Sequence, residues 1–460
     1  MTAEITISEE DLASSQELLE FIRKSPSMFH TIATERAYLD GAGFTYLPEG
    51  SAWQVKPGGS YYTTRNGSSL IAWTVGADAL ADPAHIHFQM AAAHSDSPTY
   101  KVKNVPELTG PADYLRLDVE AYGGMIDSSW FDRPLGIAGR VLVREDGKDE
   151  RTHISSRLFA PDRDLLLIPN VAIHFNRKIN DGYSYNRQVD LCPLFSAGRL
   201  QKGAFDALVA SELGVEADRI LGKDLFLVNR QQGLIWGAGQ EFVSTPKLDD
   251  LQCAFVGLKA LLVSSNKNAV NIYCCFGNEE VGSNTKQGAL STFLHDTLLR
   301  LSLSLGMDEA TYLQALSRSF MVSCDNAHAV HPNHPERTDD VNCTYLNRGV
   351  VIKEAANQKY TTDAFGRAIF SAICEGAGVP TQSFANRSDS AGGSTLGNLS
   401  NMQVSVHALD IGLPQLAMHS AFETAGTKDT LYGIRALRAF YDSNLEIDGA
   451  DGFCIQGLSS

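Results

Sequence analysis

The feature that most constrains the fold is a series of short apolar runs that alternate with helical segments and end at polar side chains. Such runs span about Ile86–Ala93, Ala269–Phe276, Ser319–Cys324 and Val404–Leu409. Short apolar runs bounded by turn residues are typical of buried strands. The last helical segment carries Leu431, Ile434, Leu437 and Phe440 on one face. This alternation predicts an α/β fold whose sheet is covered by helices on both sides.

The chain between about residues 100 and 235 has a different pattern. Leu115, Leu117 and Val119 alternate with charged residues, which indicates a strand with one solvent-exposed face. A further apolar run ends shortly before Asp146 and Gly147, a hairpin signal. We therefore predict a β-rich domain over residues 100–235, inserted between residues 1–99 and 236–460 of the first domain. The first 45 residues are expected to form two helices, the second from about Ser27 to Leu39.

Composition excludes several classes of protein. The chain is 43% apolar and 20% charged, as is ordinary for a globular protein, and it has no apolar run long enough to cross a membrane. The net charge of −16 disfavours binding to nucleic acid. The first residues lack the pattern of a signal peptide, so a cytoplasmic location is expected. Eight cysteines without a C-x-x-C pair give no support for a disulfide framework or a structural zinc site.

The candidate functional residues are acids and histidines at the ends of the apolar runs. They are His94, Asp96, Asp249, Glu279, Glu280, Asp325 and His419. Segments that are distant in the sequence meet at the carboxyl ends of strands in α/β sheets, where binding sites form. Imidazole and carboxylate ligands suit zinc, manganese or cobalt. The sequence therefore predicts a metal site, although it contains no H-E-x-x-H motif.

The charges of these residues favour two metal ions over one. Asp249, Glu280 and Asp325 bring three negative charges, which two divalent ions and one hydroxide would balance. Without metal, converging carboxylates repel and raise one another's pKa. Neighbours Glu279 and Glu280 cannot both point the same way from a strand end, so one can bind metal while the other acts as a base. Asp96 lies two residues after His94 and is expected to orient its imidazole.

With these residues, the sequence resembles the aspartyl aminopeptidase family of dinuclear metallopeptidases. The resemblance covers nearly the whole chain in the right order. It is carried by the segments Ala92–Pro98, Leu248–Leu251, Asn278–Ser283, Asp325–Asn333 and Ala417–Ser420, and by Tyr122-Gly123-Gly124 and Trp130–Arg133 in the middle block. It implies a mixed-sheet α/β/α metallopeptidase domain with an inserted β-rich dimerisation domain. It also implies a metallo-aminopeptidase that removes N-terminal residues, preferably Asp or Glu, from peptides.

The resemblance also implies a role for each candidate residue. His94 and Asp325 would bind one ion, Glu280 and His419 the other, and Asp249 would bridge two divalent ions, with zinc first and manganese or cobalt as alternatives. Glu279 would be the general base and Asp96 the partner of His94. The remaining implied roles are for His174, which would reach a neighbour's active site, and Lys353, which would bind the acidic side chain of the substrate.

The resemblance further implies self-association through the inserted domain, as dimers that assemble into a tetrahedral dodecamer. This chain departs from the family at Asp250, where relatives often carry Asn, and in the loop 389–395. The roles of His328 and His331 stay open, because either could stabilise the Asp325 loop.

Alternative functions follow from the same residues. One is a dinuclear aminopeptidase of other N-terminal specificity, or a related amidohydrolase such as a deacylase. The middle block argues against the deacylase. Another is an assembly or cargo-binding protein that has lost catalysis, against which the retention of Glu279 and of all five ligands argues.

Overall fold

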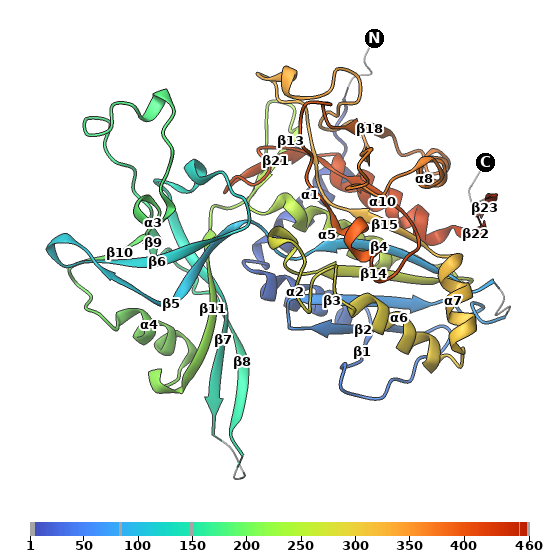
Figure 1. Ribbon diagram of the computed structural model, residues 1–460, viewed down its shortest axis with the longest axis horizontal. Coiled ribbons are helices and arrows are strands. Elements are labelled where there is room, and N and C mark those ends of the chain that lie inside the picture. The colour runs from blue at the N-terminus through green and yellow to red at the C-terminus, as the bar shows by residue number, and fades with distance from the viewer. Residues whose placement is uncertain (1–4, 82–84, 147–148, 150, 450, 458–460) are drawn as a thin grey trace.

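The computed structural model describes residues 5–81, 85–146, 149, 151–449 and 451–457. Figure 1 shows a large part built on a broad sheet and a smaller β-rich part beside it, formed by the middle of the chain. Helices α1 (Glu9–Arg23) and α10 (Asp429–Asp442), one early and one late in the chain, both lie on the large part.

A nine-stranded sheet forms the centre of the large part. Its strands, in spatial order, are β1 (Thr45–Tyr46), β2 (Ser60–Arg65), β3 (Ser69–Val75), β14 (Val270–Phe276), β4 (Phe88–His94), β15 (Phe320–Cys324), β19 (His407–Gly412), β17 (Val350–Glu354) and β18 (Thr381–Ala385). The four strands from β14 to β19 are parallel to their neighbours, whereas β3 and β17 join this group in antiparallel fashion. The sheet is therefore mixed, as predicted.

Helices cover both faces of this sheet because its strands are apolar on both sides. Tyr273 and Cys275 face one core, and Ile272 and Cys274 face the other. The first core is closed by α1 (Glu9–Arg23), α2 (Met28–Gly41), α5 (Leu248–Val263), α8 (Ala364–Gly376) and α10 (Asp429–Asp442). The second is closed by α6 (Phe293–Ser304), α7 (Glu309–Ser317) and α9 (Leu396–Ser400). The predicted α/β fold and the two helices near the N-terminus are confirmed.

The smaller part contains a seven-stranded sheet. Its order is β11 (Ile220–Asn229), β5 (Thr99–Thr109), β6 (Tyr114–Tyr122), β10 (Leu194–Ala197), β9 (Leu166–Leu167), β7 (Pro134–Glu145) and β8 (His153–Phe159), and β11 also pairs with β7. The predicted strand is β6, in which Leu115, Leu117 and Val119 are buried. The hairpin predicted after Val143 joins β7 to β8, although Gly147 lies outside the described residues. Two helices, α3 (Arg187–Asp190) and α4 (Ala204–Leu213), complete this part.

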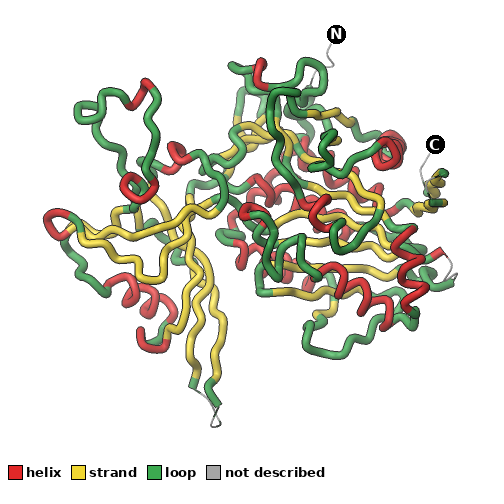
Figure 2. The backbone as a smooth tube through the Cα atoms, in the orientation of Figure 1, coloured by secondary structure: helices red, strands yellow, loops and turns green. Residues whose placement is uncertain are grey.

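A five-stranded sheet lies in the large part, toward the side where the smaller part joins it (Figure 2). Its order is β12 (Leu234–Trp236), β13 (Phe242–Thr245), β21 (Glu423–Gly426), β20 (Pro414–Leu416) and β16 (Ala327–His328). Strand β5 begins at Thr99, and β12 crosses the predicted boundary at 235/236. The chain thus passes from one sheet to another close to both predicted boundaries. The division into domains stays a prediction.

The structure differs from the sequence-based expectations at the end of the chain. The predicted strand Val404–Leu409 begins only at His407, because Val404 donates its N–H to Ser400 in a turn after α9. The C-terminal helix α10 is followed by a hairpin of β22 (Asn444–Asp448) and β23 (Gly452–Gln456). Among the described residues, no helix is long and apolar enough to cross a membrane. All eight cysteines are free.

Candidate metal centre

Three neighbouring strands of the large sheet end at one edge and deliver the candidate ligands. Strand β4 ends at His94, which pairs with Phe276 at the end of β14. A short turn then presents Glu279 and Glu280. Strand β15 ends at Cys324, directly before Asp325. The carboxyl ends of these parallel strands therefore meet, as the sequence pattern predicted.

His94 faces the acidic groups with one ring nitrogen. Its Nδ1 lies 3.1 Å from the backbone oxygen of Asp96, which fixes this nitrogen as the donor. In the neutral ring Nε2 therefore carries no proton, and it lies 3.4 Å from Asp249 Oδ1, 3.9 Å from Glu279 Oε2 and 4.0 Å from Asp325 Oδ1. This is the tautomer that a metal-binding imidazole needs.

Asp249 lies between the two histidines. Its second oxygen, Oδ2, is 3.3 Å from the Nε2 of His419, which is also 3.6 Å from Glu280 Oε2. His419 Nδ1 bonds to the backbone oxygen of Gly124 in the smaller part. Each oxygen of Asp249 thus faces a different imidazole, the arrangement of a carboxylate shared by two sites.

Asp96 anchors the turn that carries the two glutamates. Its carboxylate oxygens accept the N–H groups of Glu279 and Glu280 at 3.1 and 3.2 Å. Tyr122 donates its hydroxyl hydrogen to Asp96 at 2.7 Å, and Asn278 donates to the same hydroxyl at 2.6 Å. The Asp96 carboxylate also lies 3.5 Å from His94 Nδ1. The carboxylate therefore contacts both the glutamate turn and the imidazole, whereas sequence reasoning assigned it to the imidazole alone.

The pKa values in the cluster indicate that its buried carboxylates need positive charge nearby. Burial, with Asp325, Asp96 and Asp249 nearby, raises the pKa of Glu279 to about 8 against the opposing effect of His94. Burial and Asp249 likewise raise the pKa of Glu280 well above its usual range. Asp249 behaves oppositely, because the neighbouring imidazoles of His419 and His94 outweigh the effect of burial and lower its pKa. Both histidines have a raised pKa, His419 to about 9, because these carboxylates favour the imidazolium.

The residues present fit divalent cations. Two buried carboxylate oxygens, Asp249 Oδ1 and Glu280 Oε1, have no hydrogen-bond donor among the described residues. Ligand atoms lie within 4.8 Å of one another in three groups: His94, Asp249, Asp250 and Asp325; His94, Glu279 and Glu280; and Asp249, Glu280 and His419. The groups overlap at His94, Asp249 and Glu280, and such histidine and carboxylate ligands suit zinc.

Two residues that sequence reasoning did not assign support these ligands. Glu423 accepts the N–H of His419 at 2.7 Å and the N–H of Asp249 at 3.1 Å. Burial and Asp249 raise its pKa to about 8. Asp250 accepts the N–H groups of His94 and Asn326 at 3.1 and 3.3 Å. Since both Asp250 oxygens are engaged in this way, a carboxylate suits this position better than an amide, which offers one acceptor.

The cluster opens into a cavity of about 600 Å³ that we name the substrate-side cavity. It is lined by Asp249, Glu279, Asp325, Asn326, Ala327, His328, Lys353, Tyr360, Phe384, Gly393, Ser394, Thr395, Met418 and His419. Lys353 is buried, donates to the backbone oxygen of Asp325 at 2.7 Å and lies 3.8 Å from Asp325 Oδ2. The cavity therefore combines the acidic cluster with one buried cation in its wall.

The other predicted residues lie apart from the cluster. His174 is exposed on a loop of the smaller part and forms no hydrogen bond or ion pair with a residue that the structure describes. His328 lines the substrate-side cavity beside Phe384, with ring centroids 6.1 Å apart. His331 instead packs near His334 and accepts the N–H of Asn333 at 3.2 Å. Only His328 is thus at the candidate site within one chain.

Comparison with known proteins assigns the family. The family model for "Aminopeptidase I zinc metalloprotease (M18)" matches residues 21–441. A "Probable M18 family aminopeptidase 2" from Clostridium acetobutylicum is 42% identical over 435 residues, which cover 94% of this chain and 99% of that protein.

Solved structures agree with the sequence comparison. In "Cryo-EM structure of the Ape4 and Nbr1 complex", one chain is 34% identical, with a TM-score of 0.90 over 95% of this chain and 88% of that chain. In "Structure of S. cerevesiae mApe1 dodecamer", the identity is 27% and the TM-score 0.82, over 94% of this chain and 97% of that chain. The sequence match, the shared fold and the cluster of histidines and carboxylates agree, and the chain belongs to the M18 family of zinc metallo-aminopeptidases.

Proposed function

We propose that this aminopeptidase removes N-terminal Asp or Glu residues from peptides and uses two divalent ions per chain, zinc first with manganese or cobalt also suited. The observation that carries the proposal is the sharing of Asp249 between two ligand groups at the substrate-side cavity. His94 and Asp325 would bind one ion, Glu280 and His419 the other. Such ions, when bound, polarise a carbonyl group and favour ionisation of water.

Glu279 is the general base of the proposed reaction. Its carboxylate lines the cavity beside both ligand groups, and its backbone is held by Asp96. It would accept a proton from the attacking water and deliver that proton to the nitrogen of the leaving peptide. The role requires a carboxylate that is close to the ions without being consumed as a ligand.

The surrounding charges support an exopeptidase with an acidic preference. The free amino group of a peptide would bind near the carboxylates of the cluster. An endopeptidase substrate has no free amino group next to the bond that is cleaved. Lys353 would pair with the side-chain carboxylate of an N-terminal Asp or Glu, a charge-assisted contact. Its position in the wall of the same cavity supports this role.

Self-association belongs to the same proposal. We expect dimers through the smaller part, assembled into a dodecamer like the one that the yeast mApe1 structure is named for. The loop around His174 supports an interface because it exposes apolar side chains, with Phe175 87% exposed. His174 would then reach the substrate-side cavity of a neighbour. The cytoplasmic location stays a prediction.

The test is the release of N-terminal Asp, Glu, Lys, Leu and Ala from matched aminoacyl substrates, with zinc, manganese or cobalt supplied. Glu279→Gln should lower kcat by about 100- to 10,000-fold with its metal content unchanged. Lys353→Met should reduce kcat/KM for Asp about tenfold or more relative to Ala. Lys267→Met, which alters an exposed lysine beyond the C-terminal end of α5, is the control.

The outcomes separate the alternatives. Preference for Lys or Leu would retain the aminopeptidase and remove Lys353 from its assigned role. Absence of metal-dependent release from every substrate would refute the catalytic proposal and favour the assembly protein. Metal content near one ion per chain would contradict the two-ion site.

A further inference from the structure

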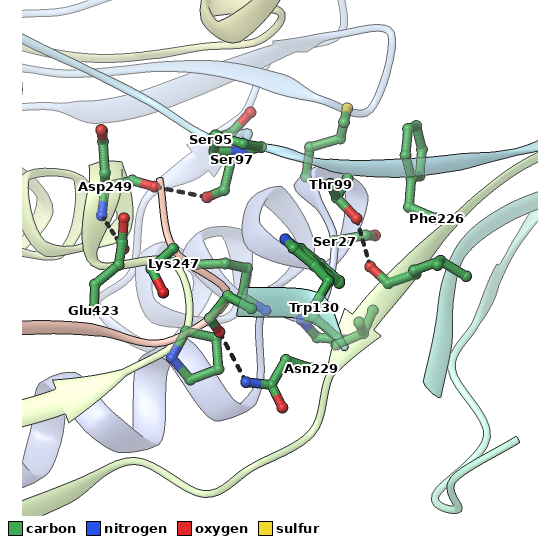
Figure 3. Close-up of a pocket in the computed structure, with 18 residues that line it drawn as sticks. Ser27, Ser95, Ser97, Thr99, Trp130, Phe226, Asn229, Lys247, Asp249 and Glu423 are labelled. Atoms are coloured by element: carbon green, nitrogen blue, oxygen red, sulfur yellow. Dashed lines mark hydrogen bonds between the residues drawn. The ribbon is translucent and has the colours of Figure 1, made fainter. Parts of the chain in front are cut away.

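A second cavity lies where the chain passes between the two parts of the molecule. It is formed around Ser97–Thr99 and Leu227–Asn229, the segments that connect the large and small sheets. We name it the junction cavity. It encloses about 590 Å³, counting its opening to solvent, and shares only Asp249 with the substrate-side cavity. Figure 3 shows its lining residues, with Asp249 and Glu423 on one side and Thr99 and Phe226 on the other.

Two hydrogen-bond donors in this cavity lack acceptors. Trp130 is 4% exposed, and its Nε1 has no acceptor among the described residues. Lys247 forms no hydrogen bond or ion pair through its side chain with any residue that the structure describes. Its Nζ is a donor in either protonation state. In Figure 3 both side chains are drawn between Glu423 on one side and Phe226 on the other. A buried donor without an acceptor costs about 1–3 kcal/mol, so Trp130 Nε1 favours a ligand that accepts hydrogen bonds. Lys247, which is partly exposed, offers a second donor to the same ligand.

The other polar groups of the cavity already have partners. Ser97 donates to the backbone oxygen of Asp249 at 2.8 Å, and Thr99 donates to that of Leu227 at 2.6 Å. Asn229 donates to the backbone oxygen of Ala421 at 2.8 Å. Both oxygens of Glu423 accept backbone N–H groups. Apart from Asp249 Oδ1, which belongs to the candidate metal centre, the unmet demand in the cavity is for an acceptor, and it comes from two donors on different segments.

The rest of the wall is apolar. Met28, Phe226 and Val228 line it, together with prolines. A bare halide would satisfy the donors but would leave these side chains against empty space or water. A carboxylate has two oxygens, one for each donor, and a short aliphatic chain would cover the apolar wall.

We propose that the junction cavity is a binding site for a small aliphatic carboxylate, held by Lys247 and Trp130. The site is separate from the substrate-side cavity and needs neither metal ion. Its ligand would touch both segments that connect the two parts of the molecule. It would also lie against Glu423, which holds the backbone of Asp249 and His419.

The test uses the zinc-loaded protein and 4,4,4-trifluorobutyrate, whose binding is followed by fluorine NMR. An amino-acid hydroxamate is present in excess, because carboxylates also bind zinc and the hydroxamate blocks that route. We expect saturable binding with a dissociation constant on the order of 1 mM, as befits so small a ligand. Lys247→Met should weaken it about tenfold or more and Trp130→Phe about two- to tenfold. Lys259→Met, in the helix that Lys247 directly precedes but paired with Glu17, should leave it unchanged.

Several results would overturn the proposal. Binding that disappears when the hydroxamate is added, or that is equal in wild type and Lys247→Met, would assign the ligand to the metals or to the surface. Displacement by chloride as effectively as by butyrate would indicate a halide site without a role for the apolar wall. Absence of binding would mean that water alone meets the two donors. If Lys247→Met does not fold, Lys247→Arg retains a donor and should bind more weakly than wild type but measurably.

Discussion

Glu423→Gln is the perturbation that most directly tests how the metal ligands are positioned. The two carboxylate oxygens of Glu423 accept the N–H groups of His419 and Asp249, one residue from each side of the cluster. A glutamine offers one oxygen and places its NH₂ group against the other N–H. The variant therefore loses one charge-assisted hydrogen bond, worth about 1.5–3 kcal/mol.

This loss converts into a measurable change in metal affinity. With about 1.36 kcal/mol for each factor of ten, we expect zinc binding to weaken by about 10- to 150-fold. That range agrees with the effect of about 10- to 100-fold that is typical of residues supporting metal ligands. A divalent ion held by Asp249 would favour the ionised form of Glu423, so the wild type would have the full pair of hydrogen bonds in the loaded state.

The assay is competition for zinc with a chromophoric chelator, with thermal unfolding in excess zinc as a check of folding. Glu241→Gln is the matched control, because Glu241 also accepts a backbone N–H, from Gly239 at 3.0 Å, but lies outside the cluster. A folded Glu423→Gln protein that binds zinc within about twofold of wild type would refute the reasoning.

Three further predictions follow from individual contacts. If His174 acts in the active site of a neighbouring subunit, equal amounts of inactive His174→Ala and Glu279→Gln subunits should complement each other in mixed assemblies. Subunit statistics give about a quarter of wild-type activity. No restoration would refute action between subunits. Tyr122→Phe removes the hydroxyl on Asp96 and should lower kcat about tenfold with little change in KM, whereas Tyr46→Phe, whose hydroxyl contacts Thr64 at the surface, should not. Burial raises the pKa of Glu35 from its usual 4.5 to about 7. Between these pH values the folded state binds more protons than the unfolded state. The protonated side chain therefore adds about 3 kcal/mol to the free energy of unfolding below pH 4.5, and this contribution is lost as the pH rises to 7. Denaturant unfolding should show a smaller fall in stability over this range for Glu35→Gln than for wild type, and exposed Glu375→Gln should behave as wild type.

The sheet and the cluster could be predicted from the sequence for a physical reason. Strand ends such as His94 and Asp325 are marked by an abrupt change from apolar to polar side chains, and parallel strands deliver their ends to one edge. His419 is less visible, since it lies on a loop after β20 and reaches the cluster through an irregular backbone with a positive φ of 67°. Its inclusion depended on residue type and on the family resemblance.

Other features could not be predicted from local patterns. Glu423 supports the ligands through backbone N–H groups, so nothing in its neighbours marks it as part of a site. The hairpin β22–β23 is short, and its burial of Leu445 depends on the core that the rest of the chain has built. The junction cavity depends on Trp130 and Lys247, which are more than 100 positions apart and meet only through the tertiary fold.

The sharing of Asp249 has a consequence for biosynthesis. Each proposed ion needs Asp249 and one histidine, and the histidines come from opposite ends of the chain, His94 early and His419 late. A chain emerging from the ribosome can therefore assemble at most one half of the centre before its final segments are made. Because metal binding stabilises only the state that presents all ligands, loading becomes a checkpoint that truncated or incompletely folded chains fail.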